Sequence, residues 1–150
     1  MSEDYAEYER ECKRIRRENA KLLDDFGDWL AANGLSDTTA GRHRENMKFY
    51  LNEFLLCEDA ERAENGVRSV GMFLGYWFIR KAMWASQASI KSNAASLKKF
   101  YTFMLEKGKV EKQDLDDLKM QIQEEMPEWL ATLARYDDPD INDSAEVWGL

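Results

Sequence analysis

Few side chains in this sequence could carry out covalent or acid–base chemistry. The chain has one histidine, His43, and two cysteines, Cys12 and Cys57, which lie 45 positions apart. This set cannot supply the closely spaced ligands of a structural zinc site. The sequence also lacks a glycine-rich phosphate loop, and neither cysteine is placed to pair with the histidine. We therefore expect no enzyme, no metal and no cofactor, and we expect both cysteines to be buried free thiols.

Adjacent acidic pairs are the remaining candidates for acid–base chemistry. Asp116-Asp117 and Glu124-Glu125 are the clearest of them. Neighbouring side chains on a helix point about 100° apart, so two adjacent carboxylates do not face each other. These pairs predict a solvated helix face rather than an active site.

The charges of the chain are segregated along the sequence. The 150 residues carry a formal net charge of −8, yet residues 65–110 hold eight bases and a single acid, Glu106. Residues 111–150 hold twelve acids and three bases. A surface that faces a polyanion would exclude carboxylates from residues 65–105. A buried core helix would exclude them as well, and the sequence alone leaves both explanations open.

Composition favours an all-α fold in a soluble protein. The chain has only eight Gly and two Pro, and 44% of its residues are hydrophobic, which disfavours both a many-stranded sheet and disorder. The first ten residues are highly charged, and the longest apolar run, Val70–Ile79, is too short to cross a bilayer. We therefore expect a cytoplasmic protein with no leader peptide, no membrane partner and no small-molecule substrate.

Apolar periodicity predicts five helices. Gly34 and Gly108 should end two of them, Pro127 should break or kink the last, and Gly71 and Gly75 should let a neighbouring element approach closely. A polar link is expected over residues 57–66. The predicted helices cover residues 3–32, 36–56, 67–83, 86–107 and 112–136.

The first of these helices has a heptad-like apolar seam with one polar member, Asn19. A buried Asn at such a position can fix the register of a coiled coil. We therefore consider self-association through this helix, giving a homo-oligomer. The alternative is that the helix packs along its own bundle, with Asn19 near an edge. The seam consists of Tyr5, Tyr8, Cys12, Ile15, Asn19, Leu22, Phe26 and Trp29.

The fourth predicted helix has a face of short polar residues opposite its apolar positions. Surface helices more often carry long charged side chains, so these short side chains suit a helix whose backbone lies close to something else. A DNA groove is one candidate, and another helix is the other. The face consists of Ser89, Ser92, Asn93, Ser96 and Lys99.

Two stretches resemble the N-terminal module of tyrosine recombinases and phage integrases. The first includes Phe26-x-x-Trp29-Leu30 and Gly34-Leu35-Ser36, followed by Thr39, His43, Asn46, Tyr50 and Phe54. The second includes Ser89-Ile90, the run from Ala94 to Met104, and Lys107-Gly108-x-Val110. Both have the order and separation typical of that family. Together they span residues 20–110.

The resemblance implies a SAM-like, or core-binding, orthogonal bundle of four main helices. In the family this module clamps one side of duplex DNA, and its second and fourth helices face the DNA. The implied role is a non-catalytic DNA-binding module in DNA recombination. Carried onto matching positions, the implied DNA contacts are Thr38, Thr39, Arg42, His43, Asn46, Ser89, Lys91, Ser92, Ser96, Lys98 and Lys99.

The sequence departs from that family after residue 110. The recombinase catalytic motif, His-x-x-Arg, is not formed by His43-Arg44-Glu45-Asn46. We divide the chain into a helical extension over 1–20, the integrase-like module over 20–110, an acidic helical segment over 111–136 and an acidic tail over 137–150. Two alternatives stay open. In one, the module serves protein–protein interaction or oligomerisation instead of DNA binding. In the other, residues 111–150 cover the basic stretch and gate its access to DNA.

Overall fold

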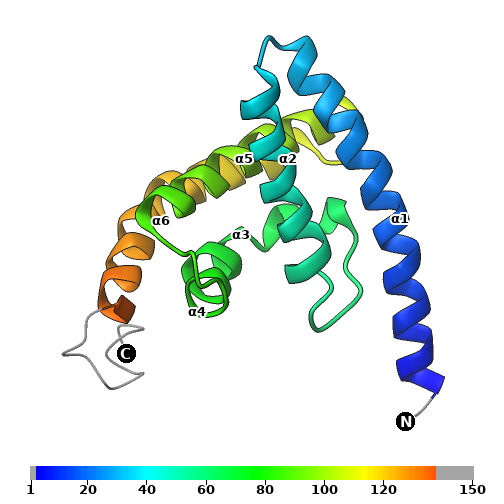
Figure 1. Ribbon diagram of the computed structural model, residues 1–150, viewed down its shortest axis with the longest axis horizontal. Helices are drawn as coiled ribbons and strands as arrows, with labels where there is room; N and C mark the ends of the chain where they lie inside the picture. Colours follow the sequence, from blue (N-terminus) through cyan, green and yellow to red (C-terminus); the bar gives the residue numbers. More distant parts are fainter. Residues whose placement is uncertain (1–2, 138–150) are drawn as a thin grey trace.

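Helices make up all the secondary structure of residues 3–137, the part of the chain that the computed structural model describes, and no strand occurs among them. The predicted all-α fold is confirmed. Figure 1 shows α1 along one edge of the molecule, with α5 and α6 running side by side across it. The elements in chain order are α1 (Glu3–Ala32), α2 (Asp37–Phe49), the π-helix η1 (Tyr50–Phe54), the 3-10 helix η2 (Ala63–Arg68), α3 (Val70–Met72), the π-helix η3 (Phe73–Trp77), α4 (Phe78–Lys81), α5 (Gln87–Glu106) and α6 (Lys112–Asp137).

The limits of α1, α2 and α5 follow from local signals. Gly34 and Gly108 adopt φ values of 86° and 74°, the left-handed conformation that ends a helix with little strain in glycine. The Ser36 hydroxyl accepts a hydrogen bond from the Thr39 amide at 3.2 Å and so caps α2. Ser86 caps α5 through a reciprocal pair of hydrogen bonds with Ser89.

The heptad-like seam of α1 packs against its own chain. Cys12 and Ile15 are buried with Leu56 in a small cluster. The Asn19 amide donates a hydrogen bond of 2.9 Å to Asn52 Oδ1, and Asn19 is only 1% exposed. Asn19 therefore lies inside the bundle, rather than at an oligomer interface or near an edge. Its polar group is satisfied by a partner in the same chain.

Tyr8 extends this intramolecular packing toward the N-terminus. Its hydroxyl donates a hydrogen bond to the Leu56 carbonyl, and its ring packs on the same small cluster. Tyr5, one turn earlier, is 50% exposed. Little of the seam is thus left for another copy of the chain. Both cysteines are free thiols, but Cys57 is exposed, so only Cys12 is buried as expected.

The second and third predicted helices differ from the structure at their ends and in their continuity. The helical stretch that starts with α2 ends at Phe54 rather than at residue 56, and its last turn is the π-helix η1. The predicted helix over 67–83 is not continuous. Its first residues belong to η2, which starts earlier, inside the expected polar link. After a break at Ser69, a second helical stretch covers residues 70–81. The two π-helical turns pack on each other, with the Tyr50 and Phe73 ring centroids 4.8 Å apart.

Two buried tyrosines hold the interrupted segment in place. The Tyr50 hydroxyl donates to the Gly66 carbonyl at 2.6 Å, and the Tyr101 hydroxyl donates to the Ala63 carbonyl at 2.8 Å. Burial raises the pKa of both phenols well above the usual value, so they remain proton donors at ordinary pH. A Cβ on Gly66 would lie 2.5 Å from the Tyr101 hydroxyl oxygen, so this position requires glycine. These long-range bonds fix a 3-10 helix that local periodicity does not indicate.

The hydrophobic core continues beyond residue 110 into α6. Leu115, Leu118 and Leu133 belong to the same buried cluster as the core residues of α1, α2 and α5. The close approach expected at the two glycines is made by α6. A Cβ on Gly75 would lie 2.8 Å from the Trp129 ring, and Gly71 lies against the Gln121 side chain. Residues 112–137 are therefore an integral layer of the bundle.

Pro127 does not break α6. The helix is continuous from Lys112 to Asp137 with Pro127 inside it, and Figure 1 shows the ribbon changing direction in the orange, C-terminal part of this helix. Of the two expected effects of this proline, the structure has the kink and not the break. The predicted tail over 137–150 lies, after Asp137, outside the described residues. No helix among residues 3–137 has the length and apolar character needed to span a membrane.

Candidate nucleic-acid interface

Four of the predicted DNA contacts lie together in the interface between α2 and α5. His43 Nδ1 and Ser96 Oγ are 2.7 Å apart. The Asn46 amide donates to Ser92 Oγ at 3.0 Å and to Ser96 Oγ at 2.9 Å. The Ser96 hydroxyl donates its proton to the Ser92 carbonyl at 3.1 Å. We refer to His43, Asn46, Ser92 and Ser96 as the polar seam.

The hydrogen-bond pattern indicates which ring nitrogen of His43 carries a proton. The Ser96 hydroxyl has one proton, which is used toward the Ser92 carbonyl, so Ser96 Oγ accepts from both His43 and Asn46. His43 must therefore carry a proton on Nδ1. Burial lowers the pKa of His43 below its ordinary value, and the positive charges of Lys99 and Arg42 lower it further. His43 is consequently neutral at pH 7.

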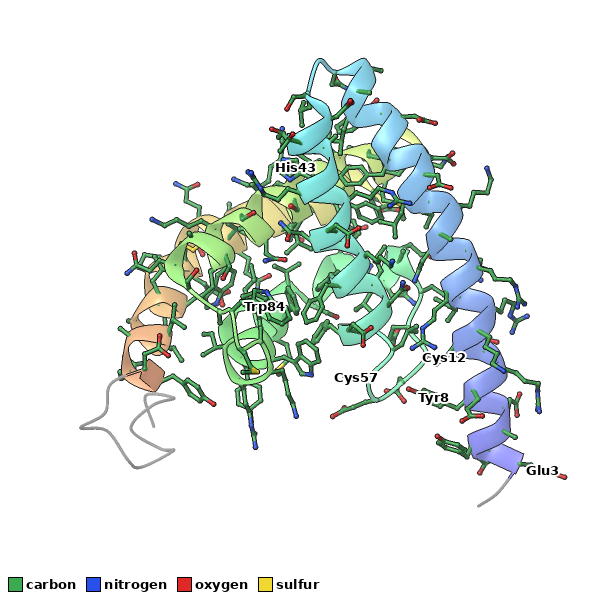
Figure 2. All side chains as sticks on the ribbon, viewed as in Figure 1. Glu3, Tyr8, Cys12, His43, Cys57 and Trp84 are labelled. Atoms are coloured by element: carbon green, nitrogen blue, oxygen red, sulfur yellow. The ribbon has the colours of Figure 1, made fainter. Side chains whose placement is uncertain are left out.

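The polar seam decides between the two explanations for the short polar face of α5. His43 is 7% exposed and Ser96 is fully buried, so these side chains face each other across the interface. Asn93 is also buried, and its amide donates to the Ser89 carbonyl within α5. Ser89 itself serves the cap of the helix. The neighbour that the short side chains accommodate is α2, and Figure 2 shows His43 at this junction.

The other predicted contacts remain accessible. Thr38, Arg42, Lys91 and Lys98 are exposed, whereas Thr39 and Lys99 are half-buried. Lys91 and Lys98 lie seven residues apart and therefore on one side of α5. Arg42 of α2 and Lys99 of α5 both lower the pKa of His43, so each helix contributes one cation near the polar seam. The accessible part of the predicted site is therefore basic.

A groove between α5 and α6 gathers three lysines. Lys98 and Lys99 from α5 and Lys119 from α6 line a groove of about 420 Å³, together with Trp29, Ala95 and Thr102. A second hollow beside it is lined by Lys98, Lys119, Ile122, Gln123 and Met126. Within residues 3–137, none of these three lysines forms an ion pair. We refer to Lys98, Lys99 and Lys119 as the lysine groove.

Sequence reasoning missed Lys119 because it lies in the strongly acidic segment. Its position becomes informative only when α6 is seen to pack along α5. No acid of α6 forms an ion pair with a lysine of the groove within the described residues. Asp116 pairs with Lys112 at 2.8 Å and Asp114 with Arg68 at 3.5 Å. The acidic helix thus leaves the lysines open and adds one more.

Neither a metal centre nor a known relative supplies another assignment. Among the described residues, 3–137, no cluster of His, Cys, Asp and Glu could hold a metal ion. Comparisons with protein-family models, with curated proteins and with solved structures gave no match to this chain. The resemblance to recombinase N-terminal modules therefore depends on the motifs between Phe26 and Val110 alone. The charges and geometry of the surface are what remains to indicate a function.

Proposed function

We propose that this protein is a non-catalytic DNA-binding module that contacts duplex DNA through the lysine groove and its basic surroundings on α2 and α5. The observation that carries the proposal is the lysine groove itself: three cations without ion pairs within the described residues converge in an otherwise acidic protein. Arg42 and Lys91 extend this positive surface. Phosphate oxygens are the ligands that such a surface favours.

The accessible residues favour backbone contact over base reading. Ser and Asn side chains can read base edges, but the ones in the polar seam are occupied by one another. What remains in reach of a duplex is chiefly Lys, Arg and Thr. Such contacts position DNA without reading its sequence. We therefore expect weak sequence preference, and the resemblance to recombinase modules supports the choice of duplex DNA.

The test is a salt titration of binding to a labelled duplex, read by fluorescence anisotropy. The informative variant replaces all three groove lysines, Lys98→Gln, Lys99→Gln and Lys119→Gln. Each phosphate contact contributes about 0.9 to the slope of log K against log[salt], so the slope should fall by about 2.7 if all three contact phosphates.

A matched control keeps the same change in net charge. The variant Arg68→Gln, Arg80→Gln and Lys81→Gln removes three exposed cations outside the groove, and it should leave the slope close to that of the unaltered chain. Equal effects of the two triple variants would show that net charge, rather than the groove, governs binding. Absence of binding by the unaltered chain at low salt would overturn the proposal.

A protein-interaction role is the second candidate, and a separate surface favours it. Met72 is 60% exposed beside a groove of about 280 Å³ that Trp77 and the carboxylates Glu58, Asp59 and Glu61 also line. A partner segment with apolar and basic side chains would fit this surface. If the DNA titration fails, replacement of Met72 by Ser is the variant with which to test partner binding.

A further inference from the structure

The outer face of α1 carries a second basic surface. Arg10, Lys13, Arg14, Arg17 and Lys21 recur at helical spacing and are all exposed. They lie opposite the buried side of the helix, which is formed by Cys12, Ile15, Asn19 and Leu23. We refer to these five cations as the α1 stripe. At 1.5 Å per residue the stripe is about 16 Å long.

Most of the α1 stripe is not neutralised. Arg14 pairs with Glu11, and Lys21 lies 3.6 Å from Asp25. Within residues 3–137, Arg10, Lys13 and Arg17 form no ion pair. The segment as a whole is acidic, since residues 1–34 carry nine acids and six bases. The segment is therefore negative as a whole, whereas the exposed face of α1 that carries the stripe is positive.

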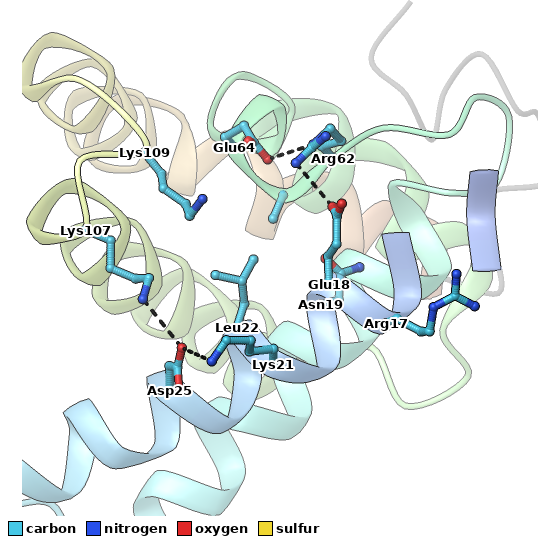
Figure 3. Close-up of a pocket in the computed structure, with 11 residues that line it drawn as sticks. Arg17, Glu18, Asn19, Lys21, Leu22, Asp25, Arg62, Glu64, Lys107 and Lys109 are labelled. Atoms are coloured by element: carbon cyan, nitrogen blue, oxygen red, sulfur yellow. Dashed lines mark hydrogen bonds and ion pairs between the residues drawn. The ribbon is translucent and has the colours of Figure 1, made fainter. Parts of the chain in front are cut away.

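A cavity of about 600 Å³ extends this positive surface away from α1. Figure 3 shows Lys109 directed into this cavity, with Lys107 and Lys21 on either side of Asp25 at one edge and Arg62 at another. Asn19, Leu22, Ala63 and Arg17 also line it.

The carboxylates that line the cavity are all engaged by cations of the same site. Glu18 and Glu64 pair with Arg62 at 3.3 and 3.5 Å. Asp25 lies 3.6 Å from Lys21 and 3.5 Å from Lys107. The cavity is lined by five bases and three acids, so a positive excess remains. An anion entering here would meet Arg17 and Lys109, which have no ion pair within the described residues.

The α1 stripe and the lysine groove are separate surfaces. They share no residue, and Asp24, Asp25 and Asp28 follow Lys21 along α1 before Trp29 reaches the lysine groove. A DNA backbone that ran directly from one surface to the other along α1 would pass these three carboxylates. One straight duplex segment is therefore a poor fit to both surfaces together.

We propose that the α1 stripe and the adjoining cavity form a second site for nucleic-acid phosphates, so that one chain can hold two DNA segments. The binding of the first DNA segment rests on the proposed function of the lysine groove. The second site is argued from the residues of the α1 stripe and the cavity alone. Three of the five cations are Arg, whose guanidinium forms paired hydrogen bonds with phosphate. The apolar side of α1 is buried in the bundle, so the helix has no free apolar face with which to enter a lipid surface.

The experiment is a stoichiometric titration of short labelled duplexes at low salt, with the full chain shown to be monomeric by light scattering. The α1 variant is Arg10→Gln, Arg14→Gln and Arg17→Gln, the groove variant is Lys98→Gln, Lys99→Gln and Lys119→Gln, and Arg68→Gln, Arg80→Gln and Lys81→Gln is the control. We expect two duplexes per chain for the unaltered protein and the control, and one for each of the other two variants. Circular dichroism checks that every variant is folded.

The outcomes separate the two proposals. If the α1 variant still binds two duplexes, the second site is wrong, whereas loss of one duplex in the groove variant would leave the proposed function standing. If only the α1 variant loses binding, the α1 stripe is the DNA site and the groove proposal is overturned. If the unaltered chain binds vesicles containing phosphatidylserine through Arg10, Arg14 and Arg17 but binds no DNA, the ligand is a lipid surface and both proposals fail.

Discussion

Two sides of α5 come from the same acid-free stretch of sequence and have different surroundings. The side toward α2 carries Ser92 and Ser96, which are engaged in the polar seam. A different side carries Lys91 and Lys98, which are exposed and have no ion pair within the described residues. Short polar side chains let two helices approach and satisfy each other's hydrogen bonds. Long cations remain in water and are available to a polyanion. The absence of acidic residues thus has two different causes within one helix.

The largest expected effect on stability comes from removing α6, because α6 and α5 share one hydrophobic core. A chain ending at residue 111 would lose Leu118, Ile122 and Trp129, which are buried in the common core. Loss of a single such side chain typically costs about 2–5 kcal/mol, so loss of the whole layer should abolish cooperative unfolding in urea. A chain ending at residue 137 keeps α6 and serves as the control. Cooperative unfolding of the shorter chain would show that the module over 20–110 is independent.

The packing of α6 also bears on whether the acidic segment gates the basic stretch. If residues 111–150 only covered that stretch, deleting them would raise the affinity for DNA. Because α6 packs through its apolar side and contributes Lys119 to the lysine groove, the deletion would instead remove part of the proposed site. The shorter chain should therefore bind DNA less well rather than better.

The next effect in size concerns the polar seam. Ser96→Ala removes the oxygen that accepts from His43 and Asn46. A buried polar group left without a partner costs about 1–3 kcal/mol, so we expect the free energy of unfolding to fall by about 2 kcal/mol in urea titrations. Ser92→Ala is the control, because Asn46 then keeps its bond to Ser96. The salt slope for DNA should be unchanged in both variants, and a change in the Ser96 variant would mean that the seam contacts DNA.

The lysine side should show the opposite behaviour. Lys91→Gln and Lys98→Gln remove exposed side chains, and such surface substitutions usually change stability by less than about 0.5 kcal/mol. Each should lower the slope of log K against log[salt] by about 0.9 if it contacts a phosphate. Urea unfolding and anisotropy on the same protein samples measure both quantities. A loss of stability without a change in slope would assign these lysines to packing.

Sequence reasoning found the parts of the molecule that local signals determine. Gly34 correctly indicates the end of α1, and the predicted ranges that begin at residues 36 and 86 start at Ser36 and Ser86, the residues that cap α2 and α5. The 3-10 helix η2 could not be found in this way, because the bonds that hold it come from Tyr50 and Tyr101, far away in the sequence.

The candidate sites also have parts that the sequence indicates and parts that depend on the three-dimensional packing. The short polar face of α5 is visible in the sequence, but its partner is not, because packing against α2 and contact with DNA favour the same small side chains. The net charge of a sequence segment hides Lys119 and the α1 stripe, because charged surfaces are formed by helix faces rather than by segments. Helical spacing alone places Arg10, Arg14 and Arg17 on one face of α1, so charges sorted by that spacing are the signal that could have found the stripe.

The smallest expected effect is a pH dependence that links the two sides of α5 through His43. Its pKa is lowered in the folded chain by burial and by Lys99 and Arg42, so the unfolded chain binds the proton more readily. The free energy of unfolding should therefore fall as pH drops below about 6.5, the ordinary pKa of histidine, until the lowered pKa is reached. His43→Asn keeps a donor toward Ser96 but does not titrate, and the carboxylates common to both chains cancel in the difference. Urea unfolding from about pH 7.5 downward, across the titration range of histidine, should show a steeper loss for the unaltered chain. Parallel curves would mean that His43 accepts its proton without penalty, which would place the polar seam, like the lysines, in contact with water.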